Sequence, residues 1–233
     1  MPWVAGIDAC RNHWFVVLHE ISSRGIACRV IHSIAEVLTF SECPTVVAVD
    51  CPIGLLDQAV PGGRECDLIA RKLLGFPRAS SVFPIPVRSA LSASSYDEAC
   101  AINAASSVDG LRLARQTFGL FPRLREVDEF ITPARQKLVV EAHPELCFYE
   151  LNGGAPMKDA KKTPQGKDAR FLLLSQAGLL DSFGNRPQGV TVDDMLDAYA
   201  VCWTAERIEL GRAKRIPEAP QVDSKGLRME MWR

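Results

Sequence analysis

Thr45-Val46-Val47-Ala48-Val49 is a continuous apolar run that ends at Asp50. Apolar side chains at successive positions are typical of a strand that is buried on both faces of a sheet. The run Trp3-Val4-Ala5-Gly6-Ile7 has the same character and also leads into an aspartate, Asp8. The sequence therefore predicts two buried strands, each with a carboxylate at its carboxyl end.

Two further apolar segments, residues 13–18 and 25–31, lie between these runs on short, turn-rich connections. Three consecutive strands joined in this way predict an antiparallel meander. Ser33 with Glu36 forms a capping box, which predicts a short helix before the fourth strand. A fifth strand is expected at residues 138–140.

Helices are predicted in the later part of the chain, at about 167–177 and 192–210. Three strands, a helix, a strand, an insertion, a strand and then helices is the order of an RNase H-like α/β fold. In that fold the first three strands of a mixed sheet are antiparallel, the later strands run parallel to the first, and helices cover both faces. We expect residues 1–233 to form a single domain of this class, with a large, mostly helical insertion at about 51–137, where prolines and glycines punctuate the sequence.

The composition excludes several classes of protein. The net charge is −1, so bulk charge gives no strong attraction to nucleic acid, and a polyanion would have to bind a local patch. The eight cysteines are scattered without a C-x-x-C pair, which argues against a zinc site. No signal peptide precedes the first strand, and no apolar run approaches the roughly 20 residues of a membrane span. We therefore expect a cytoplasmic protein that does not enter a membrane.

Two more acidic residues lie on the helix that is predicted from residue 192. Asp194 and Asp197 are three residues apart and share one face of this helix, which then continues into an apolar run. Thr191 offers another explanation for Asp194, because the two residues are spaced for a helix cap. A cap does not explain Asp197, which lies a turn further into the helix.

Parallel neighbouring strands would bring Asp8 and Asp50 to the same edge of the sheet, and the helix would carry its acids across that edge. Such carboxylates raise one another's pKa, and a divalent cation relieves the repulsion. Mg²⁺ and Mn²⁺ prefer oxygen ligands, and two such ions about 4 Å apart activate a water and stabilise the leaving oxygen of a phosphodiester. Taken singly, a strand-terminal aspartate is equally well explained as a turn residue. The predicted metal ligands and catalytic residues are Asp8, Asp50, Asp194 and Asp197.

Several polar motifs are spread over nearly the whole chain. They are Gly6-Ile7-Asp8, Val49-Asp50-Cys51-Pro52-Ile53-Gly54-Leu55, Arg64-Glu65-Cys66-Asp67 with Arg71, Ser81-Val82-Phe83-Pro84, Glu141-Ala142-His143-Pro144-Glu145, Asp194-Met195-Leu196-Asp197-Ala198 and Asp223-Ser224-Lys225-Gly226-Leu227-Arg228-Met229-Glu230-Met231-Trp232. Together they resemble an uncharacterised family described as predicted RNase H-like nucleases, the domain of unknown function family 429. The resemblance implies the fold and a nuclease activity. Separately, the acid pair before Ala198 resembles that of Holliday-junction resolvases in the same superfamily, where the fourth strand supplies a further acid, here Asp50.

His143 and Glu145 follow the fifth strand, near the proposed site. His143 would orient a water or bind phosphate, and Glu145 would be an extra ligand. Alternatively, Pro144 places both residues at the start of a helix, where Glu145 merely favours the helix dipole. We include both among the predicted catalytic residues because the resemblance contains them.

Basic residues are expected to bind the substrate. Arg64 and Arg71 are candidates for a phosphate clamp, although Asp67 and Arg71 are also spaced for an ion pair within a helix. Lys161 and Lys162 belong to a lysine-bearing loop and would contact a nucleic-acid backbone. The alternative for these lysines is a solvated loop.

Three functions remain open from the sequence. The first is a metal-dependent nuclease that hydrolyses nucleic acid by a two-metal mechanism. The second is a phosphotransferase or ATPase, because Gly6-Ile7-Asp8 followed by a turn and a basic residue resembles a phosphate-binding hairpin; that class needs a second such domain and a glycine-rich adenosine loop, and this sequence has neither. The third is a catalytically silent RNase H-like module that binds nucleic acid or a nucleotide. Carboxylates grouped within roughly 4 to 6 Å would favour catalysis, whereas scattered or salt-bridged acids would contradict it.

Overall fold

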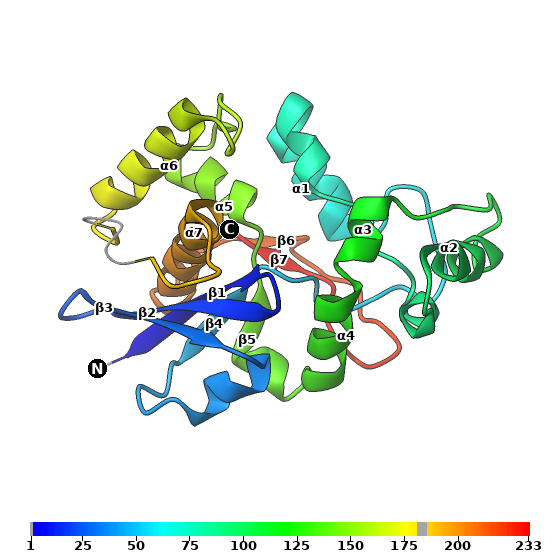
Figure 1. Cartoon of the computed structure of the whole chain (residues 1–233), viewed down its shortest axis with the longest axis horizontal. Helices are drawn as coiled ribbons and strands as arrows, with labels where there is room; N and C mark the ends of the chain where they lie inside the picture. The colour runs from blue at the N-terminus through cyan, green and yellow to red at the C-terminus, as the bar shows by residue number, and fades with distance from the viewer. Residues whose placement is uncertain (1, 181–185) are drawn as a thin grey trace. The chain divides into compact units, whose positions relative to one another are not determined.

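The computed structural model describes residues 2–180 and 186–233, and the chain forms two compact units (Figure 1). The first unit comprises the chain up to Cys51, residues 137–215 and residues 232–233. The second comprises residues 52–136 and 216–231, so the segment between the fourth and fifth strands is joined there by most of the C-terminal tail. Among the described residues, no helix is long and apolar enough to cross a membrane.

A five-stranded mixed sheet forms the centre of the first unit. Its strands are β1 (Trp3–Cys10), β2 (His13–Glu20), β3 (Gly25–Ile31), β4 (Val46–Val49) and β5 (Val139–Glu141). They lie in the order β3-β2-β1-β4-β5 (Figure 1). The first three strands are antiparallel, whereas β4 runs parallel to both β1 and β5. This is the strand order of an RNase H-like fold, which confirms the predicted fold class.

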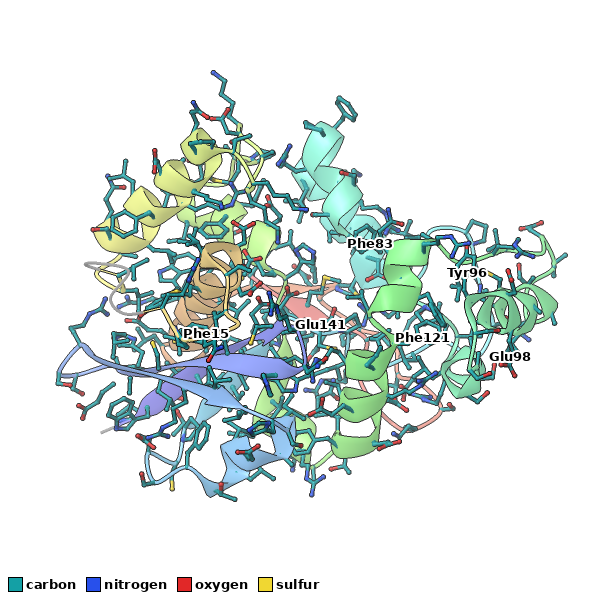
Figure 2. All side chains as sticks on the ribbon, in the orientation of Figure 1. Phe15, Phe83, Tyr96, Glu98, Phe121 and Glu141 are labelled. Carbon is teal, nitrogen blue, oxygen red and sulfur yellow. The ribbon has the colours of Figure 1, made fainter. Side chains whose placement is uncertain are left out.

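Helix α7 (Val192–Glu209) packs on one face of this sheet. Val4, Phe15 and Ala48 of three different strands share a buried cluster with the helix, and Phe15 lies between the sheet and α7 (Figure 2). Ile7, on the opposite face, is also fully buried, so both faces of the sheet are covered. The first unit also contains helices α5 (Pro144–Leu151) and α6 (Pro164–Gln176) and the 3-10 helix η1 (Ile34–Thr39).

Two of the predicted helix starts in the first unit, at Ile34 and Val192, are confirmed by their caps, whereas the helix expected from residue 167 begins earlier, at Pro164. The Ser33 side chain accepts a hydrogen bond from the η1 backbone, and Glu36 accepts one from the Ser33 N–H, which completes the capping box. Thr191 caps α7 in the same way, together with Asp194. Each cap satisfies backbone donors that the first turn of a helix leaves without a partner.

Gly6 sets how closely α7 lies against β1. A Cβ atom built on Gly6 would be 2.3 Å from the Ala198 carbonyl oxygen and 2.2 Å from the Cys202 amide nitrogen. Contacts this short exclude any side chain at this position. A glycine inside a strand often marks such a close backbone approach, and here it admits the helix that carries Asp194 and Asp197.

The second unit is mainly helical. Its α-helices are α1 (Glu65–Arg78), α2 (Tyr96–Ala105), α3 (Arg115–Gly119) and α4 (Phe121–Phe130), and its 3-10 helices are η2 (Ala79–Ser81), η3 (Arg88–Ser92) and η4 (Arg135–Lys137). The helical character expected over residues 96–118 is interrupted after Ala105. The Asn103 side chain of α2 donates to the Leu111 carbonyl oxygen at 2.8 Å, which holds the non-helical segment after Ala105 against α2. The short strands β6 (Arg215–Ile216) and β7 (Met231–Trp232) pair with each other.

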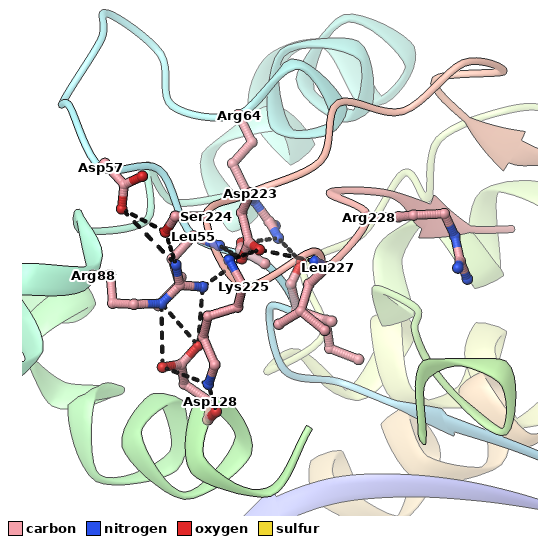
Figure 3. Close-up of polar contacts among 12 residues, drawn as sticks. Leu55, Asp57, Arg64, Arg88, Asp128, Asp223, Ser224, Lys225, Leu227 and Arg228 are labelled. Carbon is pink, nitrogen blue, oxygen red and sulfur yellow. Dashed lines mark hydrogen bonds and ion pairs between the residues drawn. The ribbon is translucent and has the colours of Figure 1, made fainter. Parts of the chain in front are cut away.

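Asp223 holds the C-terminal segment inside the second unit (Figure 3). One carboxylate oxygen accepts hydrogen bonds from the Lys225 and Leu227 amides at 2.9 Å each. The other accepts from the Leu55 amide at 3.0 Å and from the Arg88 guanidinium. Burial alone would raise the pKa of Asp223, but these donors outweigh it and lower the pKa below its usual value. The Asp223 motif of the sequence therefore has a structural role.

Candidate active site

Asp8 and Asp50 lie side by side at the carboxyl ends of β1 and β4. Ile7 pairs with Val49 in the parallel ladder, and the Asp50 amide donates to the Ile7 carbonyl oxygen at 2.9 Å. Because paired residues on neighbouring strands point to the same face, the two carboxylates share one face of the sheet. Residues alternate along a strand, so Asp8 points to the same face as Gly6, the face that α7 covers. Glu141 pairs with Val49 and therefore points to the opposite face.

The surroundings of Asp8 disfavour its charge. Its residue surface is 7 % exposed, and its strand partner Phe15 is fully buried in the core below α7. Burial is the main reason that the pKa of Asp8 is raised well above its usual value, and the charges of Asp50, Asp197 and Asp194 add to the rise. The other three acids that the sequence predicts as a cluster with Asp8 therefore all act electrostatically on it.

Asp197 reaches this group from the second turn of α7, next to the residue that contacts Gly6. Its residue surface is 4 % exposed, and the Lys161 ammonium donates to Asp197 Oδ2 at 2.6 Å. Burial raises the pKa of Asp197 to about 6, with Lys161 opposing the rise and the charges of Asp50 and Glu145 adding to it. Burial also disfavours the charged form of Lys161, but the attraction of the nearby carboxylates outweighs it and raises the lysine pKa.

Glu145 is a fifth acidic residue of the group. It lies in the first turn of α5, and Arg170 of α6 donates to its Oε1 at 2.5 Å. Glu145 Oε2 is buried and has no hydrogen-bond partner within residues 2–180 and 186–233. A buried carboxylate oxygen without a donor is costly, so Glu145 keeps a lone pair available for a further ligand.

Two predicted site residues serve as helix caps. Asp194 Oδ2 accepts from the Thr191 amide at 2.7 Å, so the capping alternative considered for Asp194 is confirmed, and one of its oxygens is engaged there. His143 caps α5, because its Nδ1 accepts from the Glu145 amide at 3.2 Å. The cap fixes Nδ1 as the acceptor nitrogen of the ring and orients Glu145.

A family model described as "Protein of unknown function (DUF429)" matches residues 6–222. This chain belongs to the DUF429 family. The family's description assigns no activity.

Comparison with curated proteins finds no match for this DUF429 protein. Among solved structures, it is similar to Thermus thermophilus RuvC, with 15% sequence identity over 91% of this chain and 98% of that chain and a TM-score of 0.35. The fold assignment rests instead on the strand order of the sheet itself.

The acid group of this DUF429 protein is not arranged as a closed metal centre. In the part of the chain that the structure describes, no three histidine, cysteine, aspartate or glutamate side chains are grouped so that they would hold a metal ion. In this conformation Lys161 pairs with Asp197, and one oxygen of Asp194 is engaged in the α7 cap. That these acids hold a metal ion stays a prediction.

The predicted arginine clamp is occupied by structural bonds within the second unit. Arg64 is 1 % exposed and donates to Asp67 at 2.8 Å and to the Ile53 carbonyl oxygen at 3.0 Å. Arg71 donates to the Val82 carbonyl oxygen at 3.0 Å and to that of Gly62. Both guanidinium groups are therefore engaged within the protein, and neither arginine belongs to the proposed site. Lys162 is exposed, and within residues 2–180 and 186–233 its side chain makes no hydrogen bond or ion pair with the acid group.

Two residues that position the site were missed in the sequence. Gly6 could have been recognised from the sequence, since glycine is unfavourable inside an apolar strand unless another backbone segment packs closely against it. Arg170 is fully buried, and its signal is an arginine directly before the apolar run Phe171-Leu172-Leu173-Leu174. A buried arginine needs an acidic partner, but the sequence does not identify which one.

Proposed function

We propose that this protein hydrolyses phosphodiester bonds of nucleic acid with the help of a divalent metal ion, Mg²⁺ or Mn²⁺. The observation that carries the proposal is the convergence of Asp50, Asp197 and Asp194 on the buried Asp8 at the carboxyl ends of two parallel strands. Burying carboxylates together is unfavourable for folding, and such groups are typical of functional sites. Ligands of α/β proteins commonly bind at this end of the sheet.

The donor chemistry fits a hard cation. All the acids are oxygen donors, which suit Mg²⁺ and Mn²⁺, and Glu145 Oε2 is buried without a hydrogen bond in the described residues. We assign Asp8, Asp50 and Asp197 as the residues that would hold the ion, with Asp194 and Glu145 at its margin. When bound, the ion would polarise a phosphodiester and lower the pKa of a water molecule.

The remaining residues would prepare the site. Arg170 fixes one Glu145 oxygen, and the His143 cap holds the helix end from which Glu145 projects. Phe15 and α7 exclude water from Asp8, which strengthens electrostatic interactions around it. The chain thus supplies rigid, partly buried carboxylates, whereas the exposed surface has to attract the polyanion.

A basic pocket at the start of α7 supports nucleic acid as the substrate. Arg11 and Arg186 line a pocket of about 290 Å³ together with Thr191, the N-cap of the helix that carries the acids. Guanidinium groups bind phosphate oxygens in a bidentate manner. This pocket provides the local positive patch that the net charge of −1 requires for a polyanion.

A silent binding module is the second candidate, and one observation favours it. Asp197 is salt-bridged to Lys161, the arrangement that we expected of acids without a catalytic role. Such a module would bind nucleic acid or a nucleotide through the basic pocket and would cleave nothing. The two candidates make opposite predictions for the same assay.

A metal-supplemented cleavage screen distinguishes them. Single-stranded, duplex, hybrid and branched nucleic acids are incubated with Mg²⁺ or Mn²⁺ and either the wild type or Asp8→Asn. Cleavage by the wild type that is lost in Asp8→Asn is the expected result. Salt-dependent binding without cleavage in both proteins would favour the silent module, with Arg11→Ala lowering the affinity. Absence of both metal binding and cleavage would overturn the proposed function.

A further inference from the structure

Lys161 lies in the loop between α5 and α6 and turns toward the protein. Its ammonium donates to Asp197 Oδ2 at 2.6 Å, although its side chain is still 41 % exposed. A lysine on a loop ordinarily extends into water, because its ammonium is strongly hydrated. The inward position of Lys161 therefore needs a structural cause.

The first cause is the close packing of this loop on α6. A Cβ atom on Gly166, in the first turn of α6, would be 2.0 Å from the Ala160 carbonyl oxygen. Thr163, the N-cap of α6, donates to the same Ala160 oxygen at 2.8 Å and accepts from the Gly166 amide at 3.1 Å. The residue directly before Lys161 is therefore fixed against the helix.

The second cause is Arg170, which joins the loop to the acid group. One guanidinium nitrogen donates to the Asp159 carbonyl oxygen at 3.2 Å and to that of Gly166 at 3.0 Å. The other donates to Glu145 at 2.5 Å. Because Arg170 is fully buried, these bonds hold the loop firmly, and Lys161 is directed at Asp197 rather than left free.

The charge of Lys161 is attracted by several acids at once. Its ammonium interacts with Asp197 first, and also with Asp50 and Asp8. These are the residues that we assign as metal ligands. A divalent ion and the ammonium therefore compete for the same carboxylate oxygens, most directly for Asp197 Oδ2.

We propose that Lys161 is a built-in counter-cation of the acid group, and that a divalent metal ion binds Asp197 only when the lysine moves away from it. The competition with a metal ion rests on the proposed function, whereas the counter-cation role of Lys161 concerns the metal-free protein. The side chain has four rotatable carbon–carbon bonds and an exposed path, so it leaves Asp197 without any movement of the fixed loop. Lys161 thus stabilises the acids while no metal is bound and sets the concentration of metal that the site requires.

The counter-cation role of Lys161 is tested without metal. Lys161→Met keeps most of the length of the unbranched side chain and removes its charge, and Lys158→Met makes the same change at an exposed position of the same loop. In chelator-treated protein, we expect Lys161→Met to lower the melting temperature by several degrees and Lys158→Met to leave it unchanged. Combining Lys161→Met with Asp197→Asn should restore most of the loss. Equal melting temperatures for the two single variants would overturn the counter-cation role.

The competition is tested by calorimetric titration with Mn²⁺ alone. We expect Lys161→Met to bind Mn²⁺ about tenfold more tightly than the wild type, and Lys158→Met to bind as the wild type does. If the wild type binds Mn²⁺ and Lys161→Met binds it equally well or more weakly, the competition is overturned and the proposed function still stands. If no variant binds Mn²⁺, the proposed function and the competition both fail, and the melting temperatures alone decide the counter-cation role.

Discussion

Gly6 and Ala198 approach so closely that a Cβ atom on Gly6 would be 2.3 Å from the Ala198 carbonyl oxygen. This contact places the second turn of α7 over the end of β1, and Asp197 is the residue before Ala198. The position of the acid therefore depends on the absence of a side chain two residues before Asp8. A backbone contact that short leaves no flexible group to move aside.

Gly6→Ala should destabilise the protein and displace Asp197 from Asp8. The added methyl group forces α7 away from β1, so we expect a loss of about 3 kcal/mol in the free energy of unfolding, measured with urea. Gly119→Ala is the matched control, because a Cβ there meets no atom within 4 Å. The control should be neutral or slightly stabilising. Similar losses in both variants would contradict the role of Gly6.

Asp8→Asn should stabilise the metal-free protein while it abolishes cleavage. Asp8 is buried among three other carboxylates, so removing its charge relieves both desolvation and repulsion. We expect the melting temperature at pH 8 to rise by about 3 to 6 °C. Asp168→Asn, at an exposed position of α6, should change neither melting temperature nor activity. A lower melting temperature for Asp8→Asn would mean that Asp8 is a structural residue.

His19 should make stability depend on pH. Neither ring nitrogen makes a hydrogen bond within the described residues, and burial followed by the charge of Arg24 lowers the His19 pKa to about 4. Glu206 lies 3.5 Å from Nδ1 but is already paired with Arg24 at 2.7 Å, so it does not reverse this shift. The folded state therefore keeps His19 neutral, whereas the unfolded chain takes up a proton below about pH 6.5.

Stability should consequently fall as the pH decreases from about 6.5 to about 4, by up to about 3 kcal/mol from this residue. His19→Leu removes the titrating group, so its stability relative to the wild type should increase over that range. Urea unfolding at pH 7.0, 6.0, 5.0 and 4.5 measures the difference between the two proteins. A constant difference across these pH values would rule out a neutral buried His19.

Asp223→Ala should weaken the second unit. It leaves the Leu55, Lys225 and Leu227 amides and Arg88 without their acceptor, and the Asp223 side chain is fully buried. We expect a loss of about 3 kcal/mol and faster proteolysis within residues 216–231. Asp223→Asn keeps one acceptor oxygen and should lose less. Equal proteolysis rates for the wild type and Asp223→Ala would show that the segment is held by other contacts.

The sequence by itself determined the sheet and the positions of its carboxylates. Apolar runs at residues 3–7 and 45–49 predicted the two central strands, and short connections predicted the antiparallel pairing of the first three. Both predictions are confirmed, because an apolar run and a short connection depend only on residues that are close in the sequence. Parallel strands in register then bring Asp8 and Asp50 together without any further information.

Only the tertiary structure decided which charges neutralise these acids. Lys161 and Asp197 are 36 residues apart, and Arg170 and Glu145 are 25 apart, so no local pattern pairs them. The same applies to Arg64. The sequence predicted it as a phosphate ligand, but its guanidinium is buried and hydrogen-bonded within the second unit. The physical reason is that the partner of a buried charge depends on which loops and helices the fold brings next to it, and those contacts join segments that are distant in the sequence.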